Sequence, residues 1–205
     1  MRIDKLVVMV SGGGTNFQSI LDACVDGRID AQVAGVVASK PGIYALERAK
    51  AAGVPSVVIS AKDFDNQPAH DEAVIKAVEA FGGQAVVLAG YMSILGAGLV
   101  SRFPIINIHP ALIPSFCGKG YYGRRVHAAV LEYGAKVSGA TVHFVDEGTD
   151  TGPIIMQKCV DVLDGDTPET LAARVLEAEH EILVKSVALL CAGRLKLDGR
   201  RVRII

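Results

Sequence analysis

Runs of apolar residues alternate with amphipathic stretches along the first half of the chain. Short, continuously apolar runs of the kind that form buried strands occur at 5–10, 32–38, 56–59, 85–89 and 104–108. Between them, apolar residues recur at helical spacing in 15–25, 44–52 and 68–80. Strands that are apolar on both faces and separated by helices predict an α/β fold of the Rossmann-like type, a mostly parallel sheet with helices on both faces.

The rhythm changes after residue 134. Alternating strands are expected at 137–145 and 154–160, joined by a turn-rich segment, and they indicate an antiparallel C-terminal extension of the sheet. A long helix is expected from Pro168 to about Leu190, with Asp166 or Thr167 as its N-cap. The alternating basic and apolar tail, 193–205, predicts a short edge hairpin or strand. No linker divides the chain, so residues 1–205 are expected to form a single domain.

Composition narrows the class of ligand. Half of the 205 residues are hydrophobic, and 21 basic and 22 acidic residues are interspersed to give a net charge of −1. This balance argues against nucleic acid or an anionic membrane as a partner and favours small molecules. The first apolar run is too short for a signal peptide, and none approaches the roughly 18 residues of a membrane span, so a soluble, cytoplasmic protein is expected.

The segment Asn107-Ile108-His109-Pro110 ends a predicted strand, and Asp150 follows in a turn-rich loop. Alternate residues of a strand share a face, so Asn107 and His109 are expected to point the same way, opposite Ile106 and Ile108. An amide, an imidazole and a carboxylate together can stabilise an oxyanion and exchange a proton, as acyl transfer requires. A hydrogen-bonded structural histidine, with Pro110 simply ending the strand, is the alternative.

A second constellation, Ser-Gly-Gly-Gly-Thr-Asn at 11–16, follows a strand and opens a helix. Glycine backbone and a helix N-terminus attract phosphate, and Gly14, Thr15 and Asn16 are the candidate donors. The dinucleotide motif fails because Phe17 stands where glycine is needed, and no Gly-Lys-Ser/Thr follows. A phosphate monoester is therefore favoured, with a purely structural turn as the alternative.

The four cysteines lie far apart without a Cys-x-x-Cys pair, so reduced thiols are expected, although Cys117 could in principle act as a nucleophile. The spacing of His127 and His143 indicates no metal cluster. The glycine- and tyrosine-rich segment 118–123 is equally consistent with a loop that closes over a substrate and with an ordinary surface loop.

With these motifs the chain resembles the phosphoribosylglycinamide formyltransferase family, folate-dependent enzymes of purine (IMP) biosynthesis. The matching motifs extend over nearly the whole chain: 11–16, 87–92, 107–116, 139–145 and 150–155. The resemblance implies the formyltransferase fold, with a phosphate-binding half at about 1–103 and a catalytic and folate-binding half at about 104–205. It also implies transfer of a formyl group from 10-formyltetrahydrofolate, a co-substrate, to the amine of phosphoribosylglycinamide, without a metal, by a monomer or homodimer.

Carried over residue by residue, the resemblance makes Asn107 a donor to the formyl oxygen, His109 the general acid and Asp150 the carboxylate that raises the pKa of the imidazole. It assigns the amine end of the substrate to Glu179, although the position of Glu179 beside an apolar helical stripe indicates an ordinary solvated glutamate. The implied folate-binding residues are Gln67, Leu88, Met92, Ser93, Ile94, Leu95, Val100, Asp146, Glu147, Gly148 and Thr149.

The chain departs from the family pattern at Ser93 and Gln67, where arginines are usual, and at Cys117, where proline is usual. A hydroxyl and a neutral amide cannot form an ion pair with the folate carboxylates, so folate binding is expected to be moderate and to depend on the apolar side chains Met92, Ile94 and Leu95 and on backbone groups. Another cation at the carboxylates, such as Lys119 or Arg124, is the alternative.

Three other functions stay open, and one feature of the sequence argues against each. A formyl-folate hydrolase would use the same triad but would need no phosphate loop, and a transferase acting on methionyl-tRNA is expected to have a more basic surface. A non-catalytic nucleotide-binding module would have no reason to place His109 and Asp150 together.

Overall fold

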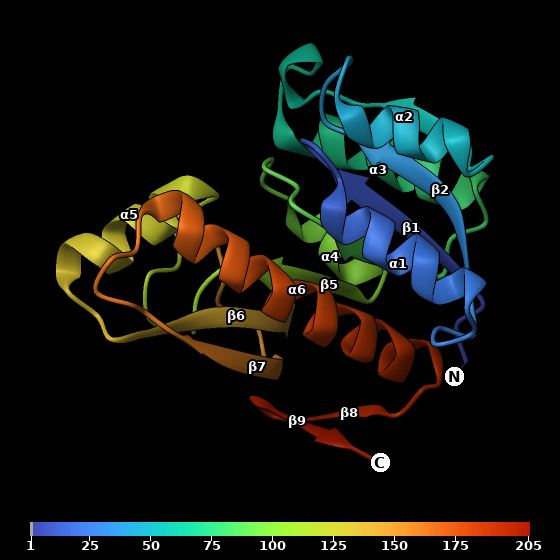
Figure 1. The fold of residues 1–205 in the computed structure, drawn as a ribbon. Helices are drawn as coiled ribbons and strands as arrows, with labels where there is room; N and C mark the ends of the chain where they lie inside the picture. The colour runs from blue at the N-terminus through green and yellow to red at the C-terminus, as the bar shows by residue number, and fades with distance from the viewer. Residues whose placement is uncertain (1) are drawn as a thin grey trace.

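A seven-stranded sheet forms the centre of the computed structural model, which describes residues 2–205 (Figure 1). The strands lie in the order β3-β2-β1-β4-β5-β6-β7; the first five are parallel, and β6 and β7 are antiparallel to their neighbours. This confirms the predicted fold class. The strands are β1 (Lys5–Val10), β2 (Gln32–Ala38), β3 (Ser56–Val58), β4 (Ala85–Leu88), β5 (Ile105–His109), β6 (Val137–Phe144) and β7 (Ile154–Asp161).

Helices cover both faces of the sheet. Alternate residues of β1 separate into two cores: Leu6, Val8 and Val10 pack on the side of α1, α5 and α6, whereas Val7 and Met9 pack on the side of α3 and α4. The helices are α1 (Thr15–Val25), α2 (Tyr44–Ala51), α3 (Gln67–Ala80), α4 (Ala97–Arg102), α5 (Arg124–Tyr133) and α6 (Pro168–Cys191), with a 3-10 turn at Ala61–Asp63. Helices α4 and α5 were not predicted.

Helix α6 is the longest element and begins where the sequence predicts. The Thr167 hydroxyl accepts a hydrogen bond from the Thr170 N–H while the Thr170 hydroxyl accepts one from the Thr167 N–H, which forms a capping box before Pro168. Of the two predicted N-caps, Thr167 is therefore the one used. Asp166 instead forms an ion pair with Arg174, nearly two turns into the helix.

The strand order reverses between β1 and β4, and the expected ligand site lies at this reversal. In open α/β sheets, ligands bind beyond the carboxyl ends of the strands at such a reversal. The loops after β1 and β4 are joined there, since the Ser11 N–H donates to the Gly90 carbonyl at 3.1 Å and the Met92 N–H donates to the Ser11 hydroxyl at 2.9 Å.

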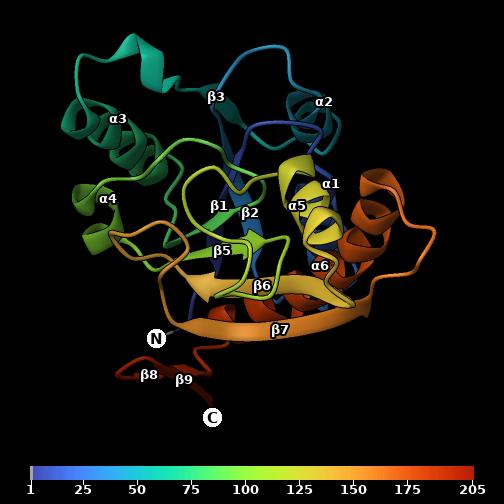
Figure 2. The same ribbon diagram turned by 90° about the vertical axis from the view of Figure 1, so that its left-hand side faces the viewer.

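The tail forms the predicted hairpin, β8 (Leu195–Asp198) and β9 (Arg201–Ile204), which lies beside the edge strand β7 (Figure 2). Arg200 at its tip donates to the carbonyl of Thr151 at 2.9 Å, so the hairpin contacts the loop that carries Asp150. Within residues 2–205, no helix combines the length and the apolar character needed to cross a bilayer.

Candidate active site

Strand β5 presents Asn107 and His109 on one face, as the alternation predicts. Ile106 and Ile108 pack into the core on the α6 side, whereas Ile105 packs on the α3 side, the face that Asn107 and His109 share. The antiparallel partner β6 sets His143 directly opposite Asn107. Side chains opposite each other in a pair of strands lie close together, so the register alone brings a second imidazole to the site.

His143 is a site residue that the sequence reasoning missed. Its Nδ1 lies 2.8 Å from the Phe144 carbonyl oxygen, which can only accept, so Nδ1 carries the proton and Nε2 of the neutral ring accepts. The Asn107 Nδ2 lies 3.1 Å from that Nε2 and donates to it. One amide N–H of Asn107 is thereby fixed and the second remains free to bind a ligand.

The imidazole of His109 is buried and faces two acceptors. Its Nε2 lies 2.9 Å from the carbonyl oxygen of Phe116, and its Nδ1 lies 3.5 Å from Oδ2 of Asp150. Burial lowers the pKa of His109, and the negative charge of Asp150 only partly opposes that effect. Asp150 thus raises the pKa of His109, as the resemblance implies, but burial of the ring lowers it by more, so the pKa of His109 lies below its ordinary value.

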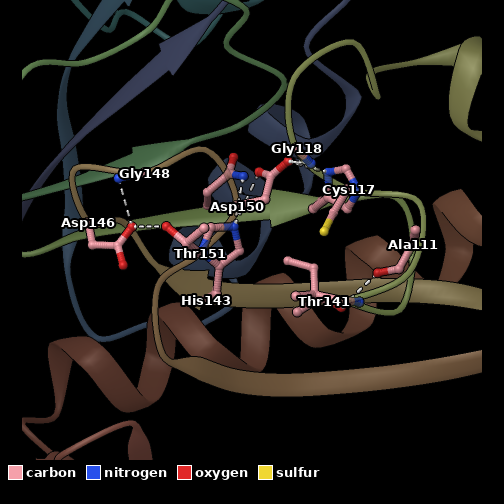
Figure 3. A network of polar contacts seen from close by, with 12 residues as sticks. Ala111, Cys117, Gly118, Thr141, His143, Asp146, Gly148, Asp150 and Thr151 are labelled. Atoms are coloured by element: carbon pink, nitrogen blue, oxygen red, sulfur yellow. Dashed lines mark hydrogen bonds and ion pairs between the residues drawn. The ribbon is translucent and has the colours of Figure 1, made fainter.

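Asp150 is held in an unusual conformation by its surroundings (Figure 3). Its φ is 58°, in the left-handed region, and its Oδ2 accepts from the Gly118 N–H at 2.9 Å, while Oδ1 lies 3.7 Å from His143 Nε2. Burial opposes ionisation, but the two imidazoles in their protonated form and the Gly118 N–H outweigh it, so the pKa of Asp150 is lowered and the carboxylate is charged at neutral pH.

The loop around Asp150 is closed by its own side chains. Asp146 accepts from the Gly148 N–H at 3.1 Å and from the Thr151 hydroxyl at 2.5 Å (Figure 3). Gly152 lies so close to the Phe144 carbonyl that an added Cβ would sit 1.7 Å from its oxygen. The strained residue is therefore fixed by packing, by internal hydrogen bonds and by Arg200 from the hairpin.

A cavity of about 480 Å³ opens against this group. Asn107, His109, Asp150 and His143 line it. Of the expected folate-binding residues, those lining it are Leu88, Met92, Ser93, Ile94, Leu95, Asp146, Gly148 and Thr149. Three others lie outside its wall: Gln67 binds Asp71 and the Ile94 carbonyl, Val100 packs on the α3 core, and Glu147 is exposed on the loop.

A second polar group lies at the N-terminus of α1. Asn16 donates from Nδ2 to Oε2 of Glu179 at 2.6 Å, and both side chains are buried. Glu179 is only 9% exposed, so the interpretation of it as a solvated residue is wrong. Burial raises the pKa of Glu179 to about 7, against the smaller opposite effect of the Asn16 hydrogen bond. The Asn16 Oδ1 is buried and has no hydrogen-bond partner within residues 2–205.

The glycines of the 11–16 loop differ in how much space surrounds them. Gly14 caps α1 with a φ of 74°, and an added Cβ would lie 2.7 Å from the Ala45 Cβ, so this glycine is required by the fold itself. A Cβ at Gly12 or Gly13 would meet nothing within 4 Å. Among residues 2–205, no side chain caps α1 by a hydrogen bond, so the first N–H groups of the helix are available to an anion.

Comparison with known proteins decides the family. The sequence profile of the formyl transferase family matches residues 4–187. The chain belongs to this family. It is 44% identical over 198 residues to the chloroplastic phosphoribosylglycinamide formyltransferase of Arabidopsis thaliana, covering 95% of this chain and 68% of that protein. It is 37% identical to the phosphoribosylglycinamide formyltransferase of Escherichia coli, covering 97% of this chain and 95% of that protein.

Solved structures agree. The crystal structure of glycinamide ribonucleotide transformylase 1 from Symbiobacterium toebii aligns with a TM-score of 0.93 and 43% identity, covering 99% of this chain and 94% of that one. Identity at this level together with a shared fold supports comparison of the sites themselves and not of the architecture alone.

Cys117 and His127 are not placed to take part in the chemistry of this formyl transferase chain. The Cys117 thiol donates to the Pro114 carbonyl at 3.3 Å, and burial raises its pKa, the opposite of what a nucleophile needs. The His127 ring is buried in α5, and burial lowers its pKa. Within residues 2–205, no group of three or more His, Cys, Asp or Glu side chains is arranged to hold a metal ion.

Proposed function

We propose that this protein transfers the formyl group of 10-formyltetrahydrofolate to the amine of phosphoribosylglycinamide, giving phosphoribosyl-N-formylglycinamide and tetrahydrofolate in purine biosynthesis. The observation that carries the proposal is the group formed by Asn107, Asp150 and the buried imidazoles of His109 and His143 at the wall of the cavity. A family match alone would fit several formyl transfer reactions, whereas this group next to a phosphate loop fits transfer to a phosphorylated amine.

Two anchors would hold the phosphorylated substrate. The N-terminus of α1, with Gly14, Thr15 and Asn16, offers N–H donors and a positive dipole end to the phosphate. Glu179, fixed by Asn16, would accept hydrogen bonds at the amine end. The loop that leads into α1 contacts the loop after β4 through the hydrogen bond from the Met92 N–H to the Ser11 hydroxyl, and the loop after β4 lines the cavity.

The cavity suits a folate. Met92 and Ile94 are 55% and 68% exposed and line the cavity together with Leu88 and Leu95, and the loop of Asp146 adds polar groups to the lining. Pockets for flat heteroaromatic ligands combine such apolar walls with a few fixed polar groups. The formyl group would then lie at the end of the cavity that Asn107 and His109 line.

During transfer a bond forms between the substrate amine nitrogen and the formyl carbon, and negative charge develops on the formyl oxygen. The free N–H of Asn107 would donate to that oxygen, with His143 holding the amide in place. His109, which is neutral in the unliganded protein, would take up a proton from solvent when the ligands bind. It would donate this proton to the same oxygen as the tetrahedral intermediate forms and recover it when the carbonyl re-forms.

Asp150 would stabilise the protonated His109 across 3.5 Å. For His109 Nε2 to reach the substrate, its bond to the Phe116 carbonyl must be given up, so substrate and this carbonyl compete for one proton. When the bond from the formyl carbon to the folate nitrogen breaks, the proton lost by the amine passes to that nitrogen through water or Asp150, which balances the reaction.

The proposal is tested by following tetrahydrofolate release by the purified protein with and without phosphoribosylglycinamide. Release that requires the ribonucleotide is expected. Equal release without it would identify a formyl-folate hydrolase, which needs no phosphate loop. A cytoplasmic location, one domain with phosphate-binding and catalytic halves, and a monomeric or homodimeric state belong to the same proposal, and sedimentation will decide the last.

A further inference from the structure

The charges around the cavity are unevenly distributed. Two carboxylates, Asp146 and Asp150, line it, and of the described residues Lys119 is the one lysine or arginine among its lining side chains. The two lining imidazoles, His109 and His143, each face Asp150 within 4 Å. For an anionic ligand that enters this cavity, Lys119 is therefore the available positively charged partner.

A folate is such an anionic ligand. Its glutamate carries two carboxylates, and a carboxylate that leaves water requires a cation or several hydrogen-bond donors as partners. Ser93 is neutral, and the amide nitrogen of Gln67 already donates to Asp71 Oδ1 at 2.7 Å and to the Ile94 carbonyl at 3.0 Å. Both positions at which the family resemblance predicts guanidinium groups are therefore without a charge, and Gln67 is engaged within the protein.

The other cations of this segment are engaged. Arg124 pairs with Glu169 at 3.1 Å, and Arg125 stacks on the Tyr122 ring with its guanidinium 4.9 Å from the ring centre. Lys119, by contrast, is exposed and has no carboxylate within 4.0 Å among residues 2–205. Its ammonium group can thus bind a ligand without breaking an existing ion pair.

The backbone around Lys119 allows it to adjust while one end stays fixed. Gly118 and Gly120 have φ values of 87° and 96°, and nothing lies within 4 Å of a Cβ built at either position. The Gly118 N–H donates to Asp150 Oδ2 at 2.9 Å, so Lys119 directly follows a residue held by the catalytic carboxylate.

We propose that Lys119 binds the glutamate carboxylates of the folate, in place of the arginines that Ser93 and Gln67 replace. This inference rests on the proposed function. Lys119 is then a specificity residue: it favours folates that carry glutamate over pteroates that lack it, and its contribution falls as salt screens the contact.

The test compares 10-formyltetrahydrofolate with 10-formyltetrahydropteroate, the same compound without glutamate, as formyl donors. We expect Lys119→Met to raise the KM for the folate about fivefold at low salt. The KM for the pteroate, the KM for phosphoribosylglycinamide and kcat should stay near the wild-type values. The matched control is Lys76→Met on α3, which removes the same charge from a residue paired with Glu72 outside the cavity.

Each other outcome overturns the assignment. An equal rise for folate and pteroate would mean that the substitution distorts the loop. A rise confined to phosphoribosylglycinamide would place Lys119 at the substrate phosphate, and a rise for Arg124→Met in place of Lys119→Met would make Arg124 the partner. Failure of the proposed function looks different, because the wild-type protein would then show no transfer to phosphoribosylglycinamide with either donor.

Discussion

Replacement of Glu179 by glutamine should stabilise the protein at alkaline pH while weakening its substrate site. Glu179 is buried in α6 with one strong hydrogen bond, from Asn16, and burial raises its pKa to about 7. A glutamine is the same shape and needs no charge. Its oxygen can accept from Asn16 Nδ2, and its amide can donate to the Asn16 Oδ1 that has no partner within residues 2–205.

The magnitude follows from the pKa. A rise from 4.5 to about 7 corresponds to about 3 kcal/mol for burying the ionised carboxylate, an upper figure. Between these pH values the folded protein holds a proton that the unfolded chain has lost, so the free energy of unfolding of the wild type falls as pH rises through this window. Glu179→Gln lacks this dependence. The variant should match the wild type near pH 4 and exceed it by up to about 3 kcal/mol above pH 8.

Urea unfolding at a series of pH values measures this difference. Glu177→Gln, two residues away on the exposed side of α6, is the matched control and should change nothing. If Glu179 binds the amine end of the substrate, the KM for phosphoribosylglycinamide should also rise on the order of tenfold, since a charge-assisted bond is lost. A stability difference that does not vary with pH would refute the reasoning, because it would show that the carboxylate is not costly to ionise.

His109→Ala and Asp150→Ala should each reduce kcat by on the order of 10²-fold, and the double variant should lose far less than the product of the two, as measured by steady-state rates. Fully multiplicative losses would assign them to separate sites. His143→Phe should reduce kcat by about tenfold with little change in either KM, because it frees the Asn107 amide; an unchanged kcat would remove His143 from the site. Gly13→Val should weaken phosphoribosylglycinamide binding in a folded protein, whereas Gly14→Val should lower the melting temperature as well; equal melting temperatures would contradict the packing argument.

Much of the fold could be predicted because the pattern is strong where elements are buried. The ranges 5–10, 15–25 and 32–38 agree with β1, α1 and β2 to the residue. Helices α4 and α5 were missed for a physical reason. Helix α4 has only six residues, and α5 follows a segment so rich in glycine and tyrosine that local preference indicates a loop. Tertiary packing of Leu99 in α4 and of Val126 and Val130 in α5 stabilises these helices.

The candidate site was partly predictable. Asn107 and His109 lie two residues apart, and the candidate phosphate-binding residues are consecutive at 14–16, so motif and alternation suffice to predict each group. The role of His143 depends on which residue of β5 it faces, and alternation alone allows pairings of β5 with β6 that differ by two residues. Glu179 contacts Asn16, 163 residues away in sequence, and Gln67 reaches the Ile94 carbonyl because α3 meets the loop after β4. Neither contact is visible in the local sequence.

The most direct test of the central claim is the fate of a labelled formyl group. The protein is incubated with 10-formyltetrahydrofolate labelled with ¹⁴C in the formyl carbon, together with phosphoribosylglycinamide, and the products are separated. We expect the label in the ribonucleotide, as its N-formyl group, in an amount equal to the tetrahydrofolate released, and almost none of it with Asp150→Ala. Label recovered as free formate at the same rate with and without the ribonucleotide would contradict the account.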